Sequence, residues 1–415
     1  MLELINPNRF DLIAKYLYIK NYFSNNKLDF YIDLYKNHII TFNKGWEYPG
    51  NKTNIDDFIN SFDNLIESIK HKGFDNNNLI EVDNNNNILN GAHRLMICYY
   101  LNIKPNIRKV NKSNYNLNYN YDFFLNRNNY WRRDNENYQN LPIIYSDTMA
   151  LEYIKIKTNV RTMILYPISY KLGKRDEIEK IINKYGVLYY KKRVNLNKNG
   201  VCNLIKELYR GEKWIGGMFP NNNCGGKFGV CYSKDPTELY VIDFYNDSKV
   251  IQFKKECRDL FNLGKHSLHI SDDNIDTFRI GSSLLNENSI YFLNNGTNNL
   301  SNNTKELLVK YFNKIGNNNE DYCLTSSLIM ELFNLRNAKD IDYLHISDYE
   351  LSLNNIGLHS GIWEKYYHIS KKIIIYNPKY HFYFNGYKFT TLNIIKKMKE
   401  NRGEEKDLKD IKLIG

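Results

Sequence analysis

Two aspartates separated by one residue, Asp340 and Asp342, lie about a dozen positions after a pair of serines, Ser326 and Ser327. On a β-strand both aspartates would project from the same face, because successive side chains alternate between faces. Adjacent carboxylates repel each other unless a cation lies between them, and a divalent metal ion is the usual cation. The alternative is a solvated strand end, which is the ordinary interpretation of an isolated D-x-D, so the surrounding elements decide between the two.

A second candidate site is the stretch NGAHRL, residues 90–95, between a short predicted strand and a predicted helix. Backbone N–H groups at such a position point outward and can bind an anion. Gly91 permits close approach of the backbone, and His93 and Arg94 add donors that suit phosphate oxygens. A tight turn in which Arg94 pairs with a local acid explains the same pattern equally well.

A third candidate is KHSLHISDD, residues 265–273, in which His266 and His269 stand three positions apart and precede an acid. Metal ligation by the two histidines is conceivable, but no third ligand has a matching spacing. The favoured interpretation is therefore a strand end with one buried and one exposed histidine.

The elements that must position these residues can be read from periodicity. Apolar residues recur with a helical period over residues 54–72, and a strand at 79–83, a strand at 88–90 and a helix ending near 101 follow. Residues 161–261 alternate strand and helix signals in the order β-α-β-α-β-α, which suggests a ferredoxin-like α+β sandwich. From residue 304 we expect a helix, the serine pair and D-I-D, one strand over HFYFNGYKF and a long charged helix to the end. The whole predicts an α+β chain of three domains over residues 1–145, 146–302 and 303–415.

Composition narrows the class of protein. The chain has 415 residues, 42% hydrophobic residues and a formal net charge of +11, which suits a polyanionic partner such as a nucleotide or nucleic acid. No stretch is a basic tail, and no 18-residue apolar run or signal peptide is visible. Six cysteines without metal spacing are expected to be buried reduced thiols. We therefore expect a cytoplasmic protein without a membrane span.

The stretch LIEVDNNNNILNGAHRLMICYYLNI resembles the ParB-like and sulfiredoxin-like superfamily, over about the first 110 residues. Members carry a G-x-H-R or related box that binds nucleotide phosphates, which implies this role for Asn90, Gly91, His93 and Arg94. Ala92 replaces the reactive cysteine of sulfiredoxins and excludes that activity. An interpretation as a free-serine-type kinase requires a carboxylate base, for which Glu47 is the candidate, although Glu47 equally fits a surface loop.

The segments RTMILYPI, the helix before Gly186, GVCNLIKELY and ECRDLF…HISDD follow the order of nucleoside-diphosphate kinases. That family keeps a catalytic histidine in an H-x-S-D motif after a phosphate-binding arginine, which implies these roles for His269 and Arg258. A phosphorylated histidine must be exposed in a cleft, with its other nitrogen held by a hydrogen bond. The family's Lys-Pro-Asp reads Tyr-Pro-Ile from Tyr166 here, which favours a shared fold without the phosphoryl relay.

Residues 303–415 resemble the DNA-polymerase-β-like nucleotidyltransferases, which carry G-S or S-S and then D-x-D about a dozen residues later. The resemblance implies that Ser326 and Ser327 bind the β- and γ-phosphates and that Asp340 and Asp342 hold Mg²⁺. A Gly usually precedes the Ser, and a third carboxylate is not evident. Asn377, Asn385 or no residue stands in its place.

These patterns together predict a Mg²⁺-dependent transferase that uses a nucleoside triphosphate, ATP or CTP. It would transfer a nucleotidyl or phosphoryl group to a small-molecule acceptor, by analogy a surface-polysaccharide building block. The competing hypotheses are a ParB-like protein that binds DNA or CTP and a regulatory scaffold without catalysis. Nucleic acid is not favoured, because no helix-turn-helix follows the NGAHRL box. The sequence gives neither the base nor the oligomeric state.

Overall fold

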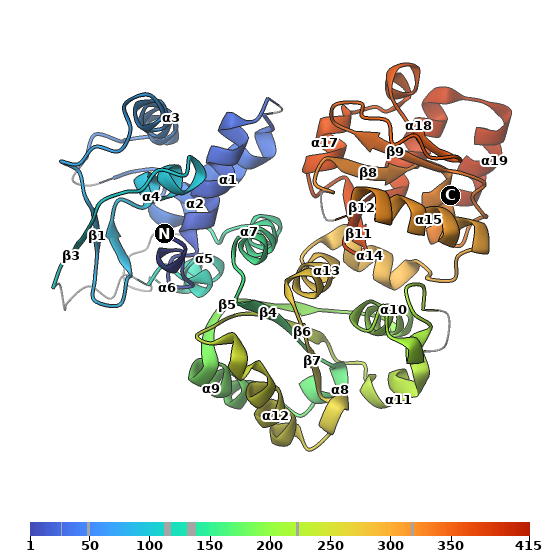
Figure 1. The fold of residues 1–415 in the computed structure, drawn as a ribbon, viewed down its shortest axis with the longest axis horizontal. Helices are drawn as coiled ribbons and strands as arrows, with labels where there is room; N and C mark the ends of the chain where they lie inside the picture. The colour runs from blue at the N-terminus through green and yellow to red at the C-terminus, as the bar shows by residue number, and fades with distance from the viewer. Residues whose placement is uncertain (26, 48–49, 112–117, 131–137, 221–223, 317–318) are drawn as a thin grey trace. The chain divides into compact units, whose positions relative to one another are not determined.

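The computed structural model describes the chain except for residues 26, 48–49, 112–117, 131–137, 221–223 and 317–318. Its described part is an α+β protein with three sheets, which confirms the predicted class (Figure 1). The contacts of the chain divide it into two compact units. Unit 1 comprises residues 1–160, 186–190 and 241–245, and unit 2 comprises residues 161–185, 191–240 and 246–415.

Unit 1 begins with helices around a small sheet of order β2-β1-β3, in which β1 is antiparallel to β2 and parallel to β3. A capping box between Asn54 and Asp57 starts α3, and Phe58, Phe62 and Ile66 bury its apolar stripe. The elements are α1 (Asp11–Phe23), α2 (Asp29–Asn43), α3 (Ile55–Lys72), β1 (Ile80–Val82), β2 (Ile88–Asn90), α4 (Ala92–Tyr100), β3 (Ile107–Lys109), α5 (Tyr121–Leu125), α6 (Arg127–Tyr130) and α7 (Ile143–Ile156).

A four-stranded sheet of order β5-β6-β4-β7 follows, with β4 and β7 antiparallel. The helix before its second strand ends at Tyr185, and Gly186 opens the strand where a Cβ atom would lie 2.4 Å from the carbonyl oxygen of Asp243. Only glycine fits this close approach. The elements are β4 (Val160–Leu165), α8 (Pro167–Tyr170), α9 (Arg175–Tyr185), β5 (Gly186–Val194), α10 (Lys198–Leu208), α11 (Lys227–Cys231), β6 (Thr237–Phe244), α12 (Val250–Phe261), β7 (Leu268–Ile270), α13 (Asn274–Leu284) and α14 (Glu287–Asn295).

The last part of unit 2, from α15 onward, contains a five-stranded mixed sheet of order β10-β9-β8-β12-β11. Alternate residues pack on opposite faces: Leu324 of β8 belongs to a core with α15, and its neighbour Cys323 belongs to a core with α17. The elements are α15 (Asn302–Ile315), β8 (Tyr322–Thr325), α16 (Ser327–Leu332), β9 (Ile341–His345), β10 (Ile356–Leu358), α17 (Lys371–Tyr376), β11 (His381–Phe384), β12 (Tyr387–Thr390), α18 (Leu392–Arg402) and α19 (Glu405–Ile414).

Two predicted elements are each divided in the structure. The stretch HFYFNGYKF is a hairpin of β11 and β12 rather than one strand, because Asn385 and Gly386 both adopt positive φ and form its two-residue turn. The long charged helix is α18 and α19, because Gly403 ends α18 in the left-handed conformation. Both corrections come from turn residues inside runs that looked uniform.

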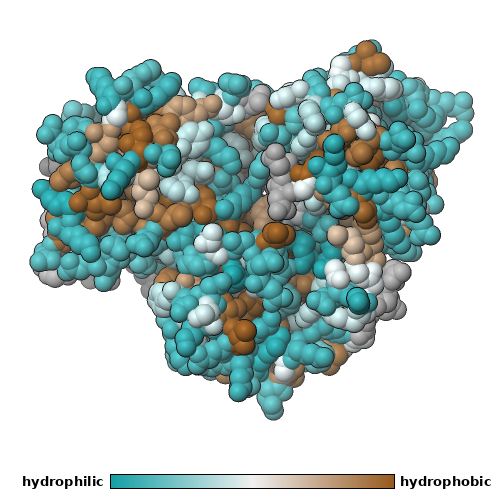
Figure 2. Space-filling model, in the orientation of Figure 1, coloured by the Kyte–Doolittle hydropathy of each residue, from teal (hydrophilic) through white to brown (hydrophobic). Residues whose placement is uncertain are grey.

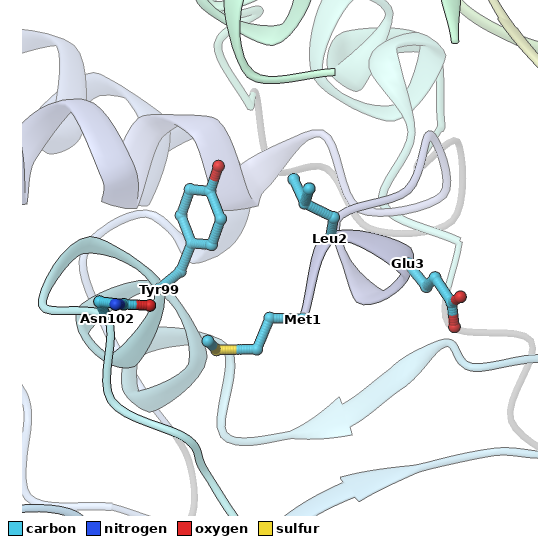
Figure 3. A pocket seen from close by; sticks show the side chains of 5 residues that line it. All are labelled: Met1, Leu2, Glu3, Tyr99 and Asn102. Atoms are coloured by element: carbon cyan, nitrogen blue, oxygen red, sulfur yellow. The ribbon is translucent and has the colours of Figure 1, made fainter. Parts of the chain in front are cut away.

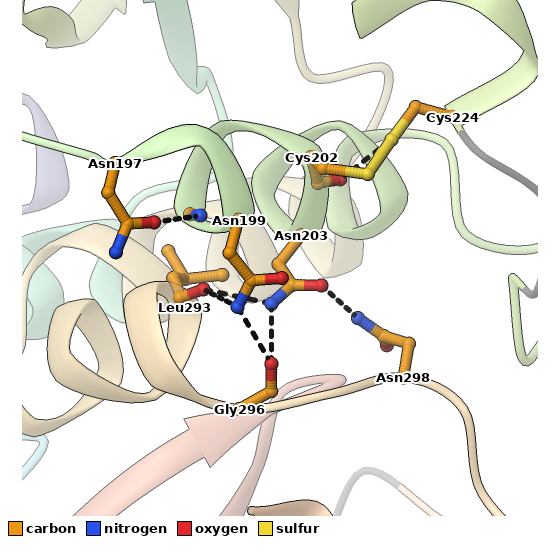
Figure 4. The surroundings of a disulfide bond; sticks show 9 residues. Asn197, Asn199, Cys202, Asn203, Cys224, Leu293, Gly296 and Asn298 are labelled. Carbon is orange, nitrogen blue, oxygen red and sulfur yellow. Dashed lines mark hydrogen bonds between the residues drawn. A yellow bond between two sulfur atoms is a disulfide. The ribbon is translucent and has the colours of Figure 1, made fainter.

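Two of the six cysteines form a disulfide, which corrects the expectation of reduced thiols. Cys202 on α10 bonds to Cys224 across 22 positions, with their Cα atoms 5.9 Å apart (Figure 4). The free cysteines are buried: Cys98, Cys231, Cys257 and Cys323. A separation of 22 residues carries no recognisable spacing, so only the fold reveals the pair. The finding removes the thiol-based argument for a reducing compartment.

Asparagine side chains close the same region of unit 2. Asn203, on α10 beside Cys202, donates to the carbonyl oxygens of Leu293 and Gly296 at 2.8 and 3.0 Å and accepts from Asn298 (Figure 4). These bonds join α10 to the end of α14.

The face of the molecule drawn in Figure 2 is mainly hydrophilic, with apolar side chains in scattered groups. In the described part of the chain, every helix is too short or too polar to cross a bilayer.

Candidate functional site

The serine pair and D-I-D lie at one end of two neighbouring strands. β8 ends at Thr325, and β9, its antiparallel partner, begins at Ile341. The register places Thr325 opposite Asp342. The chain leaves β8 through Ser326, whose φ of 63° is unusual for a residue with a side chain, and α16 begins at Ser327. This sharp turn directs both serines back toward the start of β9.

Each serine meets one of the two aspartates. The Ser327 hydroxyl donates to Asp340 Oδ1 at 3.3 Å. Burial raises the pKa of the Asp342 carboxyl, and the Ser326 hydroxyl beside it opposes that rise. Asp340 is exposed and lies in the loop just before β9, whereas Asp342 is on the strand and half-buried. The structure therefore brings together the four residues singled out in this part of the sequence.

Asp342 has a neighbour that its motif does not contain. Its Oδ2 lies 3.4 Å from Nε2 of His359, which follows β10. On β10 itself, Gly357 faces Asp342, and a Cβ atom there would lie 3.1 Å from Asp342 Oδ1. Burial raises the pKa of Asp342 above its usual value, and the neighbouring His359 opposes that rise. No local pattern pointed to His359, which lies 17 positions after Asp342 and follows a different strand, β10.

His359 belongs to a chain of buried polar groups. Its Nδ1 lies 2.9 Å from the Tyr367 hydroxyl, which is 2.8 Å from Thr325 Oγ1. Thr390 on β12 in turn donates to Thr325 Oγ1 at 3.3 Å. These hydrogen bonds connect the last residue before the serine pair to the residue that contacts Asp342.

The loop before Asp340 is held by the end of the chain. Arg336 forms two hydrogen bonds with the Asp410 carboxylate on α19, at 2.6 and 2.7 Å. Lys399 on α18 lies 2.6 Å from Asp410 and 3.2 Å from Asp407. Arg402 also pairs with Asp407, at 2.6 Å. We call Arg336, Lys399, Arg402, Asp407 and Asp410 the α18–α19 charge cluster.

The donor set of the D-I-D site is compatible with Mg²⁺. Two carboxylates with hydroxyls beside them are hard oxygen donors, which Mg²⁺ prefers, and Mg²⁺ commonly takes its remaining ligands from water and substrate phosphates. Among the residues that the structure describes, no three His, Cys, Asp or Glu side chains are grouped as a metal site. Asn377 caps the turn at Lys379, and Asn385 lies in the hairpin turn, where its backbone N–H donates to Glu207. Neither is hydrogen-bonded to the D-I-D carboxylates.

His269 and Arg258 line one pocket of about 530 Å³ in the first part of unit 2. His269, on β7, is 5% exposed. Its Nε2 is 3.8 Å from Asp276 and has no hydrogen-bond partner among the residues that the structure describes. Burial lowers the pKa of His269, and Asp276 opposes that change. A phosphorylated histidine would be exposed in the cleft, whereas His269 is buried. His266 is instead near Cys231, at 3.9 Å, so the two histidines share no site.

The walls of this His269 pocket combine charges and aromatic rings. The Tyr209 ring lies edge-on to both Trp214 and His269, with centroid distances of 4.9 Å. Arg258 lines the pocket, and its buried Nε atom has no hydrogen-bond partner among the described residues. Lys254 lies 3.4 Å from the well-exposed Asp272. The Nε donor of Arg258 is therefore available to an anionic ligand in this pocket.

The NGAHRL box is a helix start, as predicted. Gly91, with φ 94°, caps α4, and the Arg94 guanidinium donates to the carbonyl oxygen of Asn78 and to Asn90 Oδ1. His93 is turned inward, with Nε2 2.8 Å from the Tyr35 hydroxyl. Burial lowers the pKa of His93 well below its usual value. Arg94 is thus paired with local oxygens and His93 with a core tyrosine, and neither is paired with an acid.

Glu47 is an exposed loop residue that pairs with Lys52 at 2.8 Å. Glu47 raises the pKa of Tyr35, and Lys52 lowers the pKa of His93, so both charges act on the inward face of the NGAHRL box.

A separate hollow of about 490 Å³ in unit 1 contains none of these residues (Figure 3). It is lined by Met1, Leu2, Glu3, Tyr99 and Asn102.

Comparison of the chain with protein-family models, curated proteins and solved structures finds no match. The functional argument therefore depends on the geometry of these sites alone.

Proposed function

We propose that the protein is a Mg²⁺-dependent transferase that uses a nucleoside triphosphate at the D-I-D site. The observation that supports this proposal is the convergence of Ser326 and Ser327 with Asp340 and Asp342 at one end of β8 and β9. Hydroxyl donors beside a carboxylate pair are what a metal–triphosphate complex requires.

Each residue has a proposed role. Asp340 and Asp342 would hold the metal ion, and the Ser326 and Ser327 hydroxyls would donate hydrogen bonds to phosphate oxygens. When bound, Mg²⁺ would neutralise charge on the phosphates and activate the attacking oxygen of the acceptor. The acceptor is a small metabolite, and by analogy a surface-polysaccharide building block.

The finer fold assignments are part of the same proposal. The strand order β5-β6-β4-β7 is that of a ferredoxin-like sandwich, with the first strand between the third and the fourth. The mixed sheet with the serine turn supports a polymerase-β-like nucleotidyltransferase domain. The glycine-capped box, with Glu47 within electrostatic reach of Tyr35, supports a ParB-like module of the kinase type.

A second candidate function is phosphoryl transfer or phosphate binding at the His269 pocket. It is favoured by the pocket of about 530 Å³ and by the Arg258 Nε atom, which has no hydrogen-bond partner among the described residues. The burial of His269 favours binding over a phosphorylated histidine. The remaining alternative is a DNA- or CTP-binding or regulatory protein without catalysis, which predicts that the aspartates can be replaced without consequence.

Labelled nucleotides distinguish these functions. The protein is incubated with Mg²⁺, a pooled metabolite extract and each nucleoside triphosphate, labelled in turn at the α- and γ-phosphates. We expect label from the α-phosphate in a new product, with release of pyrophosphate. Asp342→Asn should abolish this transfer, and Asp259→Asn, an exposed aspartate on α12, is the matched control. Transfer of the γ-label alone would move the reaction to the His269 pocket or the NGAHRL box. No transfer from either position would contradict the enzyme proposal.

A further inference from the structure

The environment of Asp342 contains a polar path whose components come from four separate strands and loops. Asp342 is on β9, His359 follows β10, Tyr367 follows a 3-10 helix over Gly361–Tyr366, and Thr325 ends β8. Their side chains nevertheless contact one another in sequence, at 3.4, 2.9 and 2.8 Å. Because Thr325 is also the register partner of Asp342, the path closes on itself.

The hydrogen bonds in this path can be assigned one consistent direction. Thr390 donates to Thr325, and Thr325 can then donate to Tyr367. The Tyr367 hydroxyl is left to donate to Nδ1 of His359. A histidine that accepts at Nδ1 carries its proton on Nε2, which is the atom that faces Asp342. Each hydroxyl donates once, and the neutral imidazole presents a donor to the carboxylate.

The imidazole ring is fixed on its other sides as well. The backbone N–H of His359 donates to the Tyr343 carbonyl oxygen at 2.8 Å, which extends the pairing of β10 with β9. Its ring stacks on Trp363, with a centroid distance of 5.5 Å and an interplanar angle of 9°. His359 is 7% exposed, so water competes little for its contacts. The donor at Nε2 therefore has one orientation.

We propose that His359 and Tyr367 are positioning residues that orient the Asp342 carboxylate and leave its Oδ1 free for a cation. This inference rests on the proposed function, because it assigns Asp342 to a metal–nucleotide complex. Gly357 provides the space in which Oδ1 lies, since a Cβ atom there would be 3.1 Å away. A carboxylate held by a neighbouring imidazole cannot rotate freely, so its free oxygen remains directed at the site. Groups that hold a metal ligand in this way commonly contribute 10- to 100-fold to metal affinity, as an order of magnitude.

The experiment measures binding of Mn²⁺ together with a non-hydrolysable ATP or CTP analogue, by electron paramagnetic resonance of the full chain. His359→Ala should weaken Mn²⁺ binding by about tenfold or more. His359→Gln, whose side-chain amide can replace the Nε2 donor, should restore affinity to within about threefold of the original. His368→Ala is the matched control, because His368 is exposed and one position beyond Tyr367. Tyr367→Phe should lie between His359→Ala and the original.

A second readout is independent of metal binding. The ¹⁵N chemical shifts of His359 should report a proton on Nε2 and none on Nδ1, and Tyr367→Phe should alter the Nδ1 shift. Affinities for His359→Ala equal to those of the unaltered protein would overturn the positioning role, while Asp342→Asn still abolished Mn²⁺ binding. If the unaltered protein bound no Mn²⁺–nucleotide complex, the proposed function would fail and this inference with it. A loss in His359→Ala without recovery in His359→Gln would show a packing role only.

Discussion

The D-I-D site and the His269 pocket belong to the same compact unit, but the first presents carboxylates and the second presents an arginine. In the D-I-D site each acid has a polar neighbour: the Ser327 hydroxyl donates to Asp340, and His359 Nε2 lies 3.4 Å from Asp342 Oδ2. In the His269 pocket the Nε atom of an arginine lacks a hydrogen-bond partner among the described residues, and the histidine is buried beside an acid. The first arrangement suits a cation and the second suits an anion. Under the proposed function, the D-I-D site would hold the metal–nucleotide complex and the His269 pocket would bind a separate anion.

Removal of the charge of Asp342 or of Arg258 should produce the largest effects, one on each site. Asp342→Asn is expected to reduce nucleotide-dependent transfer by about 1,000-fold, because a metal ligand and its charge are lost together. Arg258→Met should leave transfer nearly unchanged and weaken binding of inorganic phosphate by about tenfold. Steady-state kinetics and calorimetry measure the two quantities. Loss of transfer in Arg258→Met would mean that the two regions form one reaction centre.

The α18–α19 charge cluster should make the stability of the folded protein decrease in acid. Burial alone would raise the pKa of Asp407, but Arg402 and Lys399 outweigh it and lower that pKa. A carboxyl with a lowered pKa stabilises the folded state above its unfolded pKa, near 3.8, and this stability is lost as the pH falls through the folded value. Asp407→Asn should cost about 3 kcal/mol at pH 7, because Arg402 loses its nearest carboxylate and Lys399 keeps only Asp410.

Chemical denaturation at pH 7 and below pH 4 tests this expectation. The difference between Asp407→Asn and the original protein should shrink in acid, where the original carboxyl also becomes neutral. Lys409→Gln is the control, since Lys409 pairs only with the exposed Glu405 on the same helix. A constant difference at all pH values would show that packing, not charge, accounts for the effect.

Reduction of the Cys202–Cys224 disulfide should affect the His269 pocket and leave the D-I-D site unchanged. The bond closes a loop that contains Trp214, which lines the His269 pocket. A loop of this length implies about 3 kcal/mol of stabilisation relative to the reduced chain. Cys202→Ser should lower the unfolding temperature and alter Trp214 fluorescence, and Mn²⁺–nucleotide affinity should stay the same. Cys257→Ser, at a buried free cysteine on α12, controls for the loss of a thiol.

The smallest expected effect concerns His269 itself. Burial lowers its pKa, and among its neighbours Asp276 and Asp272 raise that pKa while Lys254 lowers it. A histidine with a lowered folded pKa stabilises the protein when neutral, so stability should decline as the pH falls below about 6.5. His269→Gln should flatten this decline, visible as a change of a few degrees in the unfolding temperature. An unchanged slope would mean that the pocket hydrates His269 freely.

Local sequence rules were sufficient where a feature depends on neighbouring residues. The helical stripe of α3, the glycine that opens α4 and the serine turn after β8 each follow from a few adjacent side chains. The position of His359 beside Asp342 could not be predicted in this way. It depends on β10 joining the edge of β9 in parallel register, which no local pattern encodes. The disulfide depends similarly on a loop that returns to α10.

The inward orientation of His93 shows a further limit. The box pattern indicates that a helix begins at Gly91, but the helical period alone does not say whether position 93 faces solvent or Tyr35. That orientation follows from the packing of α2 and α3 beside α4, which brings Phe62 to a centroid distance of 4.5 Å from the His93 ring. Donor residues in a motif can therefore be enclosed by the core that the motif helps to build.

The hydrogen bonds between Arg336 and Asp410 also bear on how the protein is made. The loop that presents Asp340 is held by a helix that lies 74 positions further along the chain. During synthesis the D-I-D strand leaves the ribosome well before α19, so until that helix emerges the loop has only its bonds to earlier residues, such as Ala338 to Glu331. The contact between Arg336 and Asp410 can therefore form only after α19 has been synthesised, and a nascent chain that stops before Asp410 should present Asp340 without it.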